Sequence, residues 1–480
     1  MNSPLAAPLS TAHCPLSTLG SPPIPPGYKQ TDVGVIPEEW EVSSVGREFE
    51  IKLGKMLDSE KNFGVSKPYL GNRAVQWDRI DISDLPNVPM TRADIERFRL
   101  RKGDLLVCEG GEVGRAAIWD APIDECYYQK AIHRLRALRG FDSRLMAALL
   151  RLWSERGLLA NYVTQTSIAH LPREKFMEIP IPVPPLPEQR AIAEALSDVD
   201  ALLCGLDRLI AKKRDLKQAT MQQLLTPPRA GQAGQTRLPG FKGEWEVKRL
   251  GEVGKCLRGV SYQGDSDLSN RDTTRTKRLL RSNNVQDAVV VTEDVQFVNA
   301  ARVTLLQVLK KDDILICMAN GSKALVGKSG LFRVIDGYEY TFGAFMGCFR
   351  TNPNETNPSF VFYLFQTGRY RDYINNLLAG SSINNLRPSS IESLEFPIPP
   401  LPEQTAIAGV LSDMDTELAA LEQRREKTRA LKQGMMQELL TGRIRLGAGG
   451  EQKGKMRHIE EMGRIKHGAP VSHKARGGAA

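Results

Sequence analysis

Apolar side chains recur at alternating intervals of four and three residues in two long stretches of this chain. This spacing lines them up in one stripe along a helix and is typical of a coiled-coil seam. Such helices need a partner, so we expect the two to pair antiparallel; two independent amphipathic helices, each docked on its own domain, are the alternative. The expected pairing positions are Ile192, Leu196, Val199, Leu203 and Leu206 in the first stretch, and Ile407, Leu411, Met414, Leu418 and Leu421 in the second.

The two stretches are copies of one sequence. Residues 185–226 return as 400–441 without a gap, at an offset of 215 residues and with 24 of 42 positions identical. Pro187 and Pro402 suit the first turn of a helix. The first helix, over 187–225, is then roughly 58 Å long at about 1.5 Å per residue. A repeat with this period is a whole domain followed by a helix, and not a solenoid unit.

Shorter matches extend the repeat upstream of both helices. Glu-Trp-Glu-Val occurs at Glu39 and again at Glu244, and apolar runs at 101–108 and 310–317 predict one buried strand in each copy. Between these anchors the copies differ almost everywhere. This pattern favours a shared scaffold that carries divergent loops.

The repeat divides the chain into two similar α+β domains, each followed by a long helix. Proline clusters at 180–185 and 397–400 are expected to end each domain in an extended segment. The expected boundaries are 1–26 for a disordered leader, 27–184 for the first domain, 185–226 for its helix, 227–240 for a linker, 241–399 for the second domain, 400–446 for its helix, and 447–480 for a disordered basic tail.

Bulk composition is that of an ordinary globular protein. A chain of 480 residues exceeds one hydrophobic core and suits two domains. Hydrophobic residues make up 41% and charged residues 25%, and no run of 18 apolar residues predicts a membrane span. Seven cysteines without a Cys-x-x-Cys pair suit reduced thiols in the cytoplasm and give no zinc site.

The net charge of +9 does not by itself indicate nucleic-acid binding, because most of it lies in residues 443–480, which hold nine Lys or Arg against three Glu. Local clusters of positive charge in the two domains are the better indicator. Residues 271–281 contain five cations and one acid. Arg and Lys neutralise phosphates, and Arg, Asn and Gln can read base edges; a solvated basic face is the alternative. The candidate DNA-binding residues are Asn72, Arg73, Gln76, Arg92 and Arg99 in the first domain, and Arg275, Lys277, Arg278, Arg281 and Asn283 in the second.

Several segments resemble enzyme motifs but lack a required spacing or residue. Residues 321–329 resemble a P-loop but place five residues between the glycines instead of four, so a turn between strands is the expected structure. Asn357-Pro-Ser-Phe360 resembles an adenine methyltransferase motif with a wrong third residue, and we expect it to begin a helix over 360–378. His133 and His170 have no Ser or Cys at motif spacing. We therefore predict no catalytic residues and no metal site.

The chain resembles the specificity subunits of type I restriction-modification systems. Gly34-Val-Ile-Pro-x-x-Trp40 and Leu238-Pro-Gly-Phe-x-Gly-x-Trp245 are similar to the domain openings of that family. Pro-Leu-Pro-Glu-Gln before each helix, and Leu-Leu-Thr-Gly-Arg-Ile-Arg ending at Arg445, are similar to its two conserved regions. The resemblance runs from about Gly27 to Leu446.

The resemblance implies a non-catalytic scaffold. Each target recognition domain would read one half of a split, asymmetric double-stranded DNA site, and the paired helices would set the spacer. Two methyltransferase subunits and the restriction subunits would dock on it. The chain itself would hold no cofactor, whereas those partners would use S-adenosylmethionine, ATP and Mg²⁺. A standalone nuclease or methyltransferase, and a protein scaffold without DNA contact, are the rival hypotheses.

Overall fold

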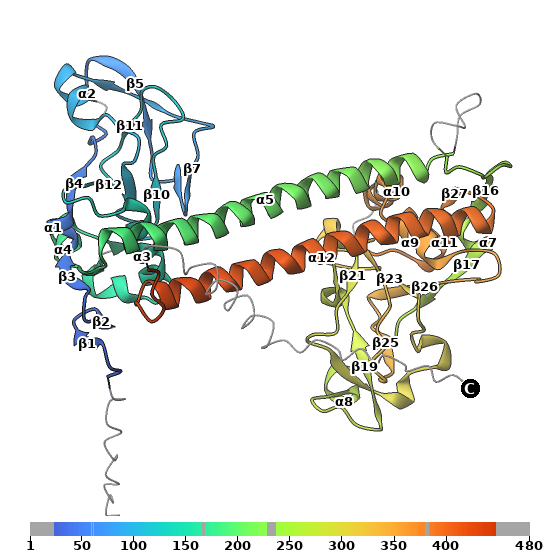
Figure 1. Cartoon of the computed structure of the whole chain (residues 1–480). Coiled ribbons are helices and arrows are strands. Elements are labelled where there is room, and N and C mark those ends of the chain that lie inside the picture. The colour runs from blue at the N-terminus through green and yellow to red at the C-terminus, as the bar shows by residue number, and fades with distance from the viewer. Residues whose placement is uncertain are drawn as a thin grey trace, which may run out of the picture. The chain divides into compact units, whose positions relative to one another are not determined.

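The computed structural model describes residues 24–58, 60, 62–165, 169–227, 237–379 and 384–447 (Figure 1). The expected leader and basic tail lie almost entirely outside these residues. The chain forms two compact units, and both long helices contribute to each of them. Unit 1 runs up to Cys204 and resumes at Glu426, and unit 2 is Gly205–Arg425.

The main sheet of unit 1 has four antiparallel strands in the order β10-β9-β12-β4. They are β4 (Phe49–Leu53), β9 (Leu105–Cys108), β10 (Ala116–Ile118) and β12 (Ile132–Ala137). The buried strand predicted at 101–108 is confirmed as β9, whose four side chains are all buried. Helix α3 (Ser143–Glu155) packs beside the sheet and begins at Asp142, whose carboxylate accepts a hydrogen bond from the Arg144 amide.

A second, smaller layer of unit 1 shares an apolar cluster with strands of the main sheet. It contains β5 (Val65–Leu70), β8 (Asn87–Met90), β11 (Tyr127–Tyr128) and helix α2 (Arg92–Phe98). Figure 1 shows β5, β11 and α2 gathered away from α3. Strand β5 pairs antiparallel with β8 and parallel with β11. Thr91 and Asp94 form a capping box that fixes the start of α2.

Short elements complete unit 1. Strand β3 (Glu41–Ser44) pairs with β15 (Pro180–Val183), so the predicted extended proline segment closes the domain against its own opening strand. The others are β1 (Tyr28–Thr31), β2 (Gly34–Pro37), α1 (Val45–Glu48), β6 (Val75–Gln76), β7 (Arg79–Ile80), η1 (Leu158–Tyr162), β13 (Thr164–Gln165), β14 (Ala169–His170) and α4 (Arg173–Glu178).

Unit 2 repeats this plan with the same chain order. Its main sheet has the order β17-β26-β23-β24-β21-β20, and its second sheet the order β18-β22-β19-β25. The strands are β17 (Gly254–Arg258), β18 (Leu268–Ser269), β19 (Thr276–Leu280), β20 (Val285–Gln286), β21 (Val289–Val290), β22 (Gln296–Asn299), β23 (Ile314–Cys317), β24 (Ser329–Leu331), β25 (Tyr340–Phe342) and β26 (Met346–Thr351). The strand predicted at 310–317 is confirmed as β23.

The remaining elements of unit 2 include a second closing pair, β16 (Glu246–Arg249) with β27 (Glu395–Ile398). The helices are α7 (Leu250–Val253), α8 (Gly264–Asp267), η2 (Ser282–Asn284), η3 (Ala300–Arg302), η4 (Leu305–Gln307), η5 (Lys323–Leu325), α9 (Pro358–Leu364), α10 (Gly368–Ala379) and α11 (Pro388–Glu392). The glycine-rich segment 321–329 joins the antiparallel strands β23 and β24, which confirms a turn there.

One helix prediction was wrong. The segment 360–378 is not a single helix, because α9 ends at Leu364 and α10 begins at Gly368. The Thr367 hydroxyl lies at the break, where it donates to the Leu364 carbonyl and accepts from the Tyr370 amide. A side chain that bonds nearby backbone in this way competes with the helical ladder. The predicted start is confirmed, since Asn357 accepts from the Ser359 and Phe360 amides.

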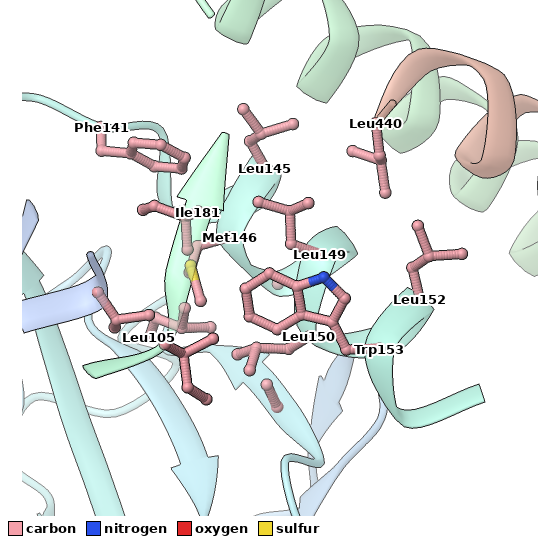
Figure 2. Packing of buried hydrophobic residues seen from close by; sticks show 14 of the residues in the cluster. Leu105, Phe141, Leu145, Met146, Leu149, Leu150, Leu152, Trp153, Ile181 and Leu440 are labelled. Carbon is pink, nitrogen blue, oxygen red and sulfur yellow. The ribbon is translucent and has the colours of Figure 1, made fainter. Parts of the chain in front are cut away.

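The two long helices are α5 (Leu186–Leu224) and α12 (Leu401–Leu439), within one residue of the range predicted for the first. In unit 1 the start of α5 shares an apolar cluster with the end of α12, through Ile192 and Leu196 with Met436 and Leu440. Figure 2 shows Leu440 near Leu149 and Leu152 of α3. No helix among the described residues is long and apolar enough to cross a membrane.

In unit 2 the end of α5 and the start of α12 share a cluster in the same manner. The sequence seam stopped short of these ends, so it missed the residues that complete both clusters. They are Met221, Leu224 and Leu225 on or just after α5, and Met435, Met436, Leu439 and Leu440 at the end of α12. Their Met-x-x-Leu-Leu pattern, present in both copies, was the available signal.

The glutamate in the repeated Leu-Pro-Glu-Gln start has the same role in both helices. Glu188 is buried and accepts two hydrogen bonds from Arg445, at 2.7 and 2.8 Å, and one from the Trp40 indole at 3.0 Å. Glu403 is matched by Arg237, at 2.7 and 2.5 Å. The residues that follow one helix therefore bind the first turn of the other, within each unit.

Candidate nucleic-acid interface

The first group of predicted DNA-binding residues lies in the turn between β5 and β6. The Asn72 amide donates to the Gly110 carbonyl at 2.9 Å, and the Gln76 amide donates to the Arg73 carbonyl at 2.6 Å. Asn72 and Gln76 thus hold the backbone of the turn. Arg73 is exposed, and among the described residues no side chain or carbonyl accepts from its guanidinium.

The second domain builds the same turn. The Gln286 amide donates to the Asn283 carbonyl at 2.9 Å, so Gln286 repeats the role of Gln76. The position three residues earlier is Arg73 in one copy and Asn283 in the other, and both side chains are exposed. A scaffold shared by the two copies therefore presents a different hydrogen-bonding side chain in each domain.

Arg92 and Arg99 lie on α2 and at its C-terminal end. The Arg92 side chain is 94% exposed and lies 3.5 Å from Glu96, an exposed pair that contributes little to stability. Arg99 donates to the Asp124 carbonyl at 3.2 Å. Within the described residues no hydrogen bond or ion pair joins these arginines to the Asn72–Gln76 turn, so the first-domain candidates form two groups.

In the second domain most predicted cations are already paired. The pairs are Lys277 with Glu339, Arg278 with Asp272 at 3.0 Å and Asp336 at 3.3 Å, and Arg281 with Asp294 at 3.3 Å. Asn283 also donates to Asp294, at 3.2 Å. Three of these acids come from segments beyond residue 290, so the count of five cations against one acid overstated the free positive charge.

Arg278 is the most constrained of these candidates. Its guanidinium lies 3.3 Å from the centre of the Tyr338 ring and donates to the Tyr340 hydroxyl at 2.9 Å. That hydroxyl donates to Asp336 and, with Arg278 facing it, holds the pKa of the Asp336 carboxyl below its usual value. Arg278 therefore joins β19 to the segment before β25.

Three exposed arginines are free of such pairing. Arg275, which was predicted, has no side-chain partner among the described residues. Arg79, beside the first-domain turn, and Arg271, beside β18, were not singled out and have no hydrogen-bond or ion-pair partner for their guanidinium there either. Their exposure and lack of pairing within the described residues distinguish these arginines from the paired cations, and a single sequence does not show which side chains are exposed.

His133, one of the two histidines considered in the sequence, makes a buried contact with the backbone. His133 is buried, its Nε2 lies 2.9 Å from the Leu171 carbonyl, and burial lowers its pKa to about 4. A neutral imidazole that donates to a backbone carbonyl has a structural role. In the described part of the chain no group of three or more His, Cys, Asp or Glu could hold a metal ion.

Comparison with known proteins places these features in a family. Residues 37–212 and 242–430 each match the type I restriction modification DNA specificity domain. The putative type I restriction enzyme MjaX specificity subunit of Methanocaldococcus jannaschii is 24% identical over 428 residues, which is 87% of this chain and 97% of the relative. The EcoKI specificity subunit of Escherichia coli K12 is 32% identical over 205 residues, 42% of this chain and 43% of the relative.

Solved structures share the fold. The S subunit of a type I restriction-modification system from M. genitalium aligns with a TM-score of 0.54 at 17% identity, over 83% of this chain and 96% of that one. A chain from work on complex assembly and conformational transition of the type I R-M system aligns with a TM-score of 0.51 at 17% identity, over 85% and 99%. The mixed α/β architecture with two similar domains is thus that of these subunits.

Proposed function

Because this chain belongs to the family of type I restriction-modification DNA specificity domains, with two copies of the domain, we propose that it is the subunit that recognises a bipartite, asymmetric DNA site for a type I restriction-modification complex. The supporting observation is the turn that both domains build with Gln76 or Gln286 and that presents Arg73 in one and Asn283 in the other. Two domains that share this turn but present different side chains to DNA can recognise two different half-sites.

The recognition domains would be residues 27–184 and 241–399, and α5 and α12 would pair as an antiparallel coiled coil that sets the spacer. The contacts within each unit support this pairing. Asp200 of α5 pairs with Lys432 of α12 at 2.6 Å in unit 1, and Lys213 pairs with Glu417 at 2.7 Å in unit 2. As the residue number rises along α5 it falls along α12, which is the register of antiparallel helices.

The partners would be double-stranded DNA, two methyltransferase subunits and the restriction subunits of the complex. The outer face of α5 supports docking on the helices, because Leu209 and Leu216 lie seven residues apart and are 39% and 51% exposed. This chain would have no cofactor of its own. S-adenosylmethionine, ATP and Mg²⁺ would be used by the partner subunits, in the cytoplasm where the DNA is.

Exchange of one recognition domain tests the proposal. Residues 40–180 would be replaced by the corresponding domain of another specificity subunit, and the modified adenines in the host genome would be mapped. We expect one half of the recognised sequence to change and the other half to stay. An unchanged sequence would exclude this function, and so would a change in both halves.

A further inference from the structure

Four charged residues of unit 1 form an ion-pair cluster, here called the Asp78 cluster, that ties the first recognition domain to the helices. Lys432 of α12 lies 2.6 Å from Asp200 of α5 and 3.4 Å from Asp78, in the turn between β6 and β7. Arg151 of α3 also pairs with Asp78, and its guanidinium lies 5.6 Å from the centre of the Trp77 ring. The Lys432 side chain is only 10% exposed.

Unit 2 keeps only half of this arrangement. At the helix offset of 215, Lys217 and Asp415 correspond to Lys432 and Asp200, and they form the same ion pair. The shared Val-Gln of β6 and β20 aligns Asp78 with Ala288, which cannot accept a proton or a hydrogen bond through its side chain. The same offset aligns Arg151 with Gln366, whose amide donates to the Ser329 hydroxyl at 2.8 Å.

A cavity of about 1540 Å³ lies where the missing side chains would be. Ala288, Gln366, Lys217 and Asp415 all line it, together with residues of α5, α9 and α12. Small-molecule sites are about 300–1,000 Å³, so this volume suits a polypeptide segment better. Val289, on the same lining, is 58% exposed, so the cavity is open to solvent.

The lining has the chemistry of a protein interface. Five cationic side chains face three acidic ones, and apolar side chains such as Met221, Val289 and Phe362 lie among them. The lining carries only two more cations than acids. This excess is small for a phosphate backbone with its repeated charges, but it is complementary to a single carboxylate flanked by apolar groups. In unit 1 Asp78 pairs with Lys432 and Arg151, and Trp77 lies beside Arg151. In unit 2 Asp287 takes the position of Trp77 and lines the cavity, so no large apolar side chain stands there.

We propose that the cavity of unit 2 receives a segment of a methyltransferase subunit in which an acidic side chain lies beside a large apolar one. The carboxylate takes the position that Asp78 holds in unit 1 and pairs with Lys217. This identification of the partner rests on the proposed function. It gives the two units unequal docking surfaces, because the chain itself fills the corresponding place in unit 1.

The test restores the chain's own carboxylate. Ala288 has φ 67°, a left-handed conformation that Asp adopts more readily than Ala, and Asp78 itself has φ 61°. Ala288→Asp should therefore fold, and its pairing with Lys217 should keep or raise the unfolding temperature. Its affinity for the methyltransferase subunit should fall about tenfold or more, because the new carboxylate occupies Lys217 and repels the incoming one.

Two control variants separate charge from bulk and from position. Ala288→Asn adds nearly the same volume without charge and should weaken binding less than Ala288→Asp. Leu305→Asp adds the same charge at a residue that is 90% exposed and does not line the cavity, and it should leave the affinity unchanged. Affinities would be measured by titrating the full-length chain with its methyltransferase subunit at one salt concentration.

Three results would overturn the inference. The first is an unchanged affinity of Ala288→Asp for the methyltransferase subunit, and the second is an equal loss in Leu305→Asp. The third is weaker DNA binding by Ala288→Asp without the partner, which would assign the cavity to nucleic acid. Failure of the proposed function is distinguishable, since the unaltered chain would then bind no methyltransferase subunit or would keep its recognised sequence after domain exchange.

Discussion

At the scale of single residues, the paired and the unpaired arginines of the second domain should respond differently to substitution. Arg275→Ala should weaken binding to the recognised DNA at least about fivefold and leave the unfolding temperature unchanged, because its side chain is exposed and unpaired among the described residues. Arg278→Ala removes the contacts to Tyr338, Tyr340 and Asp336 and should lower the unfolding temperature by about 2–4 °C or more.

Thermal unfolding and DNA titration at fixed salt would measure both effects. Unfolding of Arg275→Ala at a lower temperature would show that this residue has a structural contact. A loss of DNA affinity in Arg278→Ala without any loss of stability would show that Arg278 contacts DNA, as predicted from the sequence.

These residues also mark what a single sequence can tell about the site. Residue type and clustering located the segments 72–76 and 271–283, and the structure shows them as turns and strand ends on the second layer of each domain. The sequence could not show that Asp294, Asp336 and Glu339 neutralise the second cluster, because folding brings those acids from other segments. Nor could it show that the Gln76 amide donates to the Arg73 carbonyl within its own turn.

At the scale of elements, the Arg237–Glu403 pair joins the segment before β16 to the start of α12. Their side chains are 8% and 1% exposed. Removing one member of a buried ion pair costs about 3–5 kcal/mol, because the other charge stays buried without compensation. The guanidinium of Arg237 reaches solvent where it bonds the exposed Gly243 carbonyl, so water can replace part of the lost interaction and we expect about 2–3 kcal/mol of destabilisation for Arg237→Met.

Denaturant unfolding of the full chain would measure this loss. The double variant Arg237→Met with Glu403→Gln should recover part of it, since no buried charge remains. If the double variant were as unstable as the sum of both single variants, the two side chains would not interact.

Element prediction succeeded where the pattern was long and failed where one side chain decided the outcome. The seam and the first-turn prolines predicted α5 to within one residue, because the period persists over many turns. The break between α9 and α10 follows from the local hydrogen bonds of Thr367, which the surrounding apolar residues hid. The closing pairs β3–β15 and β16–β27 depend on residues more than 130 positions apart.

At the scale of the whole molecule, the length of α5 should determine the spacer between the two half-sites. Four residues inserted after Leu206 lengthen the helix by about 6 Å and turn it by about 400°, which nearly preserves its facing. Since base pairs rise by about 3.4 Å, the variant should prefer the same half-sites with a spacer altered by one or two base pairs. Mapping of modified adenines would reveal the spacer.

The same four residues inserted between positions 228 and 236 are the matched control, and they should leave the spacer unchanged. An altered spacer in the control, or an unaltered spacer in the α5 variant, would show that the length of α5 does not set the spacer.

The internal repeat predicted two similar domains with two helices, and unit 1 and unit 2 agree with it. It did not predict which residues at the helix ends would join the core of each unit. Leu225 and Leu440 lie beyond the predicted seam positions, and within each unit they share an apolar cluster with the beginning of the other helix.

The distribution of thiols makes the boundary between the units accessible to spectroscopy. Cys108, Cys126, Cys256, Cys317 and Cys348 are buried, and burial raises the pKa of Cys126 and Cys256 to about 12, so these thiols stay protonated and react slowly near neutral pH. Cys204 is exposed and is the residue at which α5 passes from unit 1 to unit 2. With Cys14, which lies outside the described residues, replaced by serine, a maleimide dye would mark this one point. Its polarisation would then report any change in mobility at this point of α5 when DNA or a partner subunit binds.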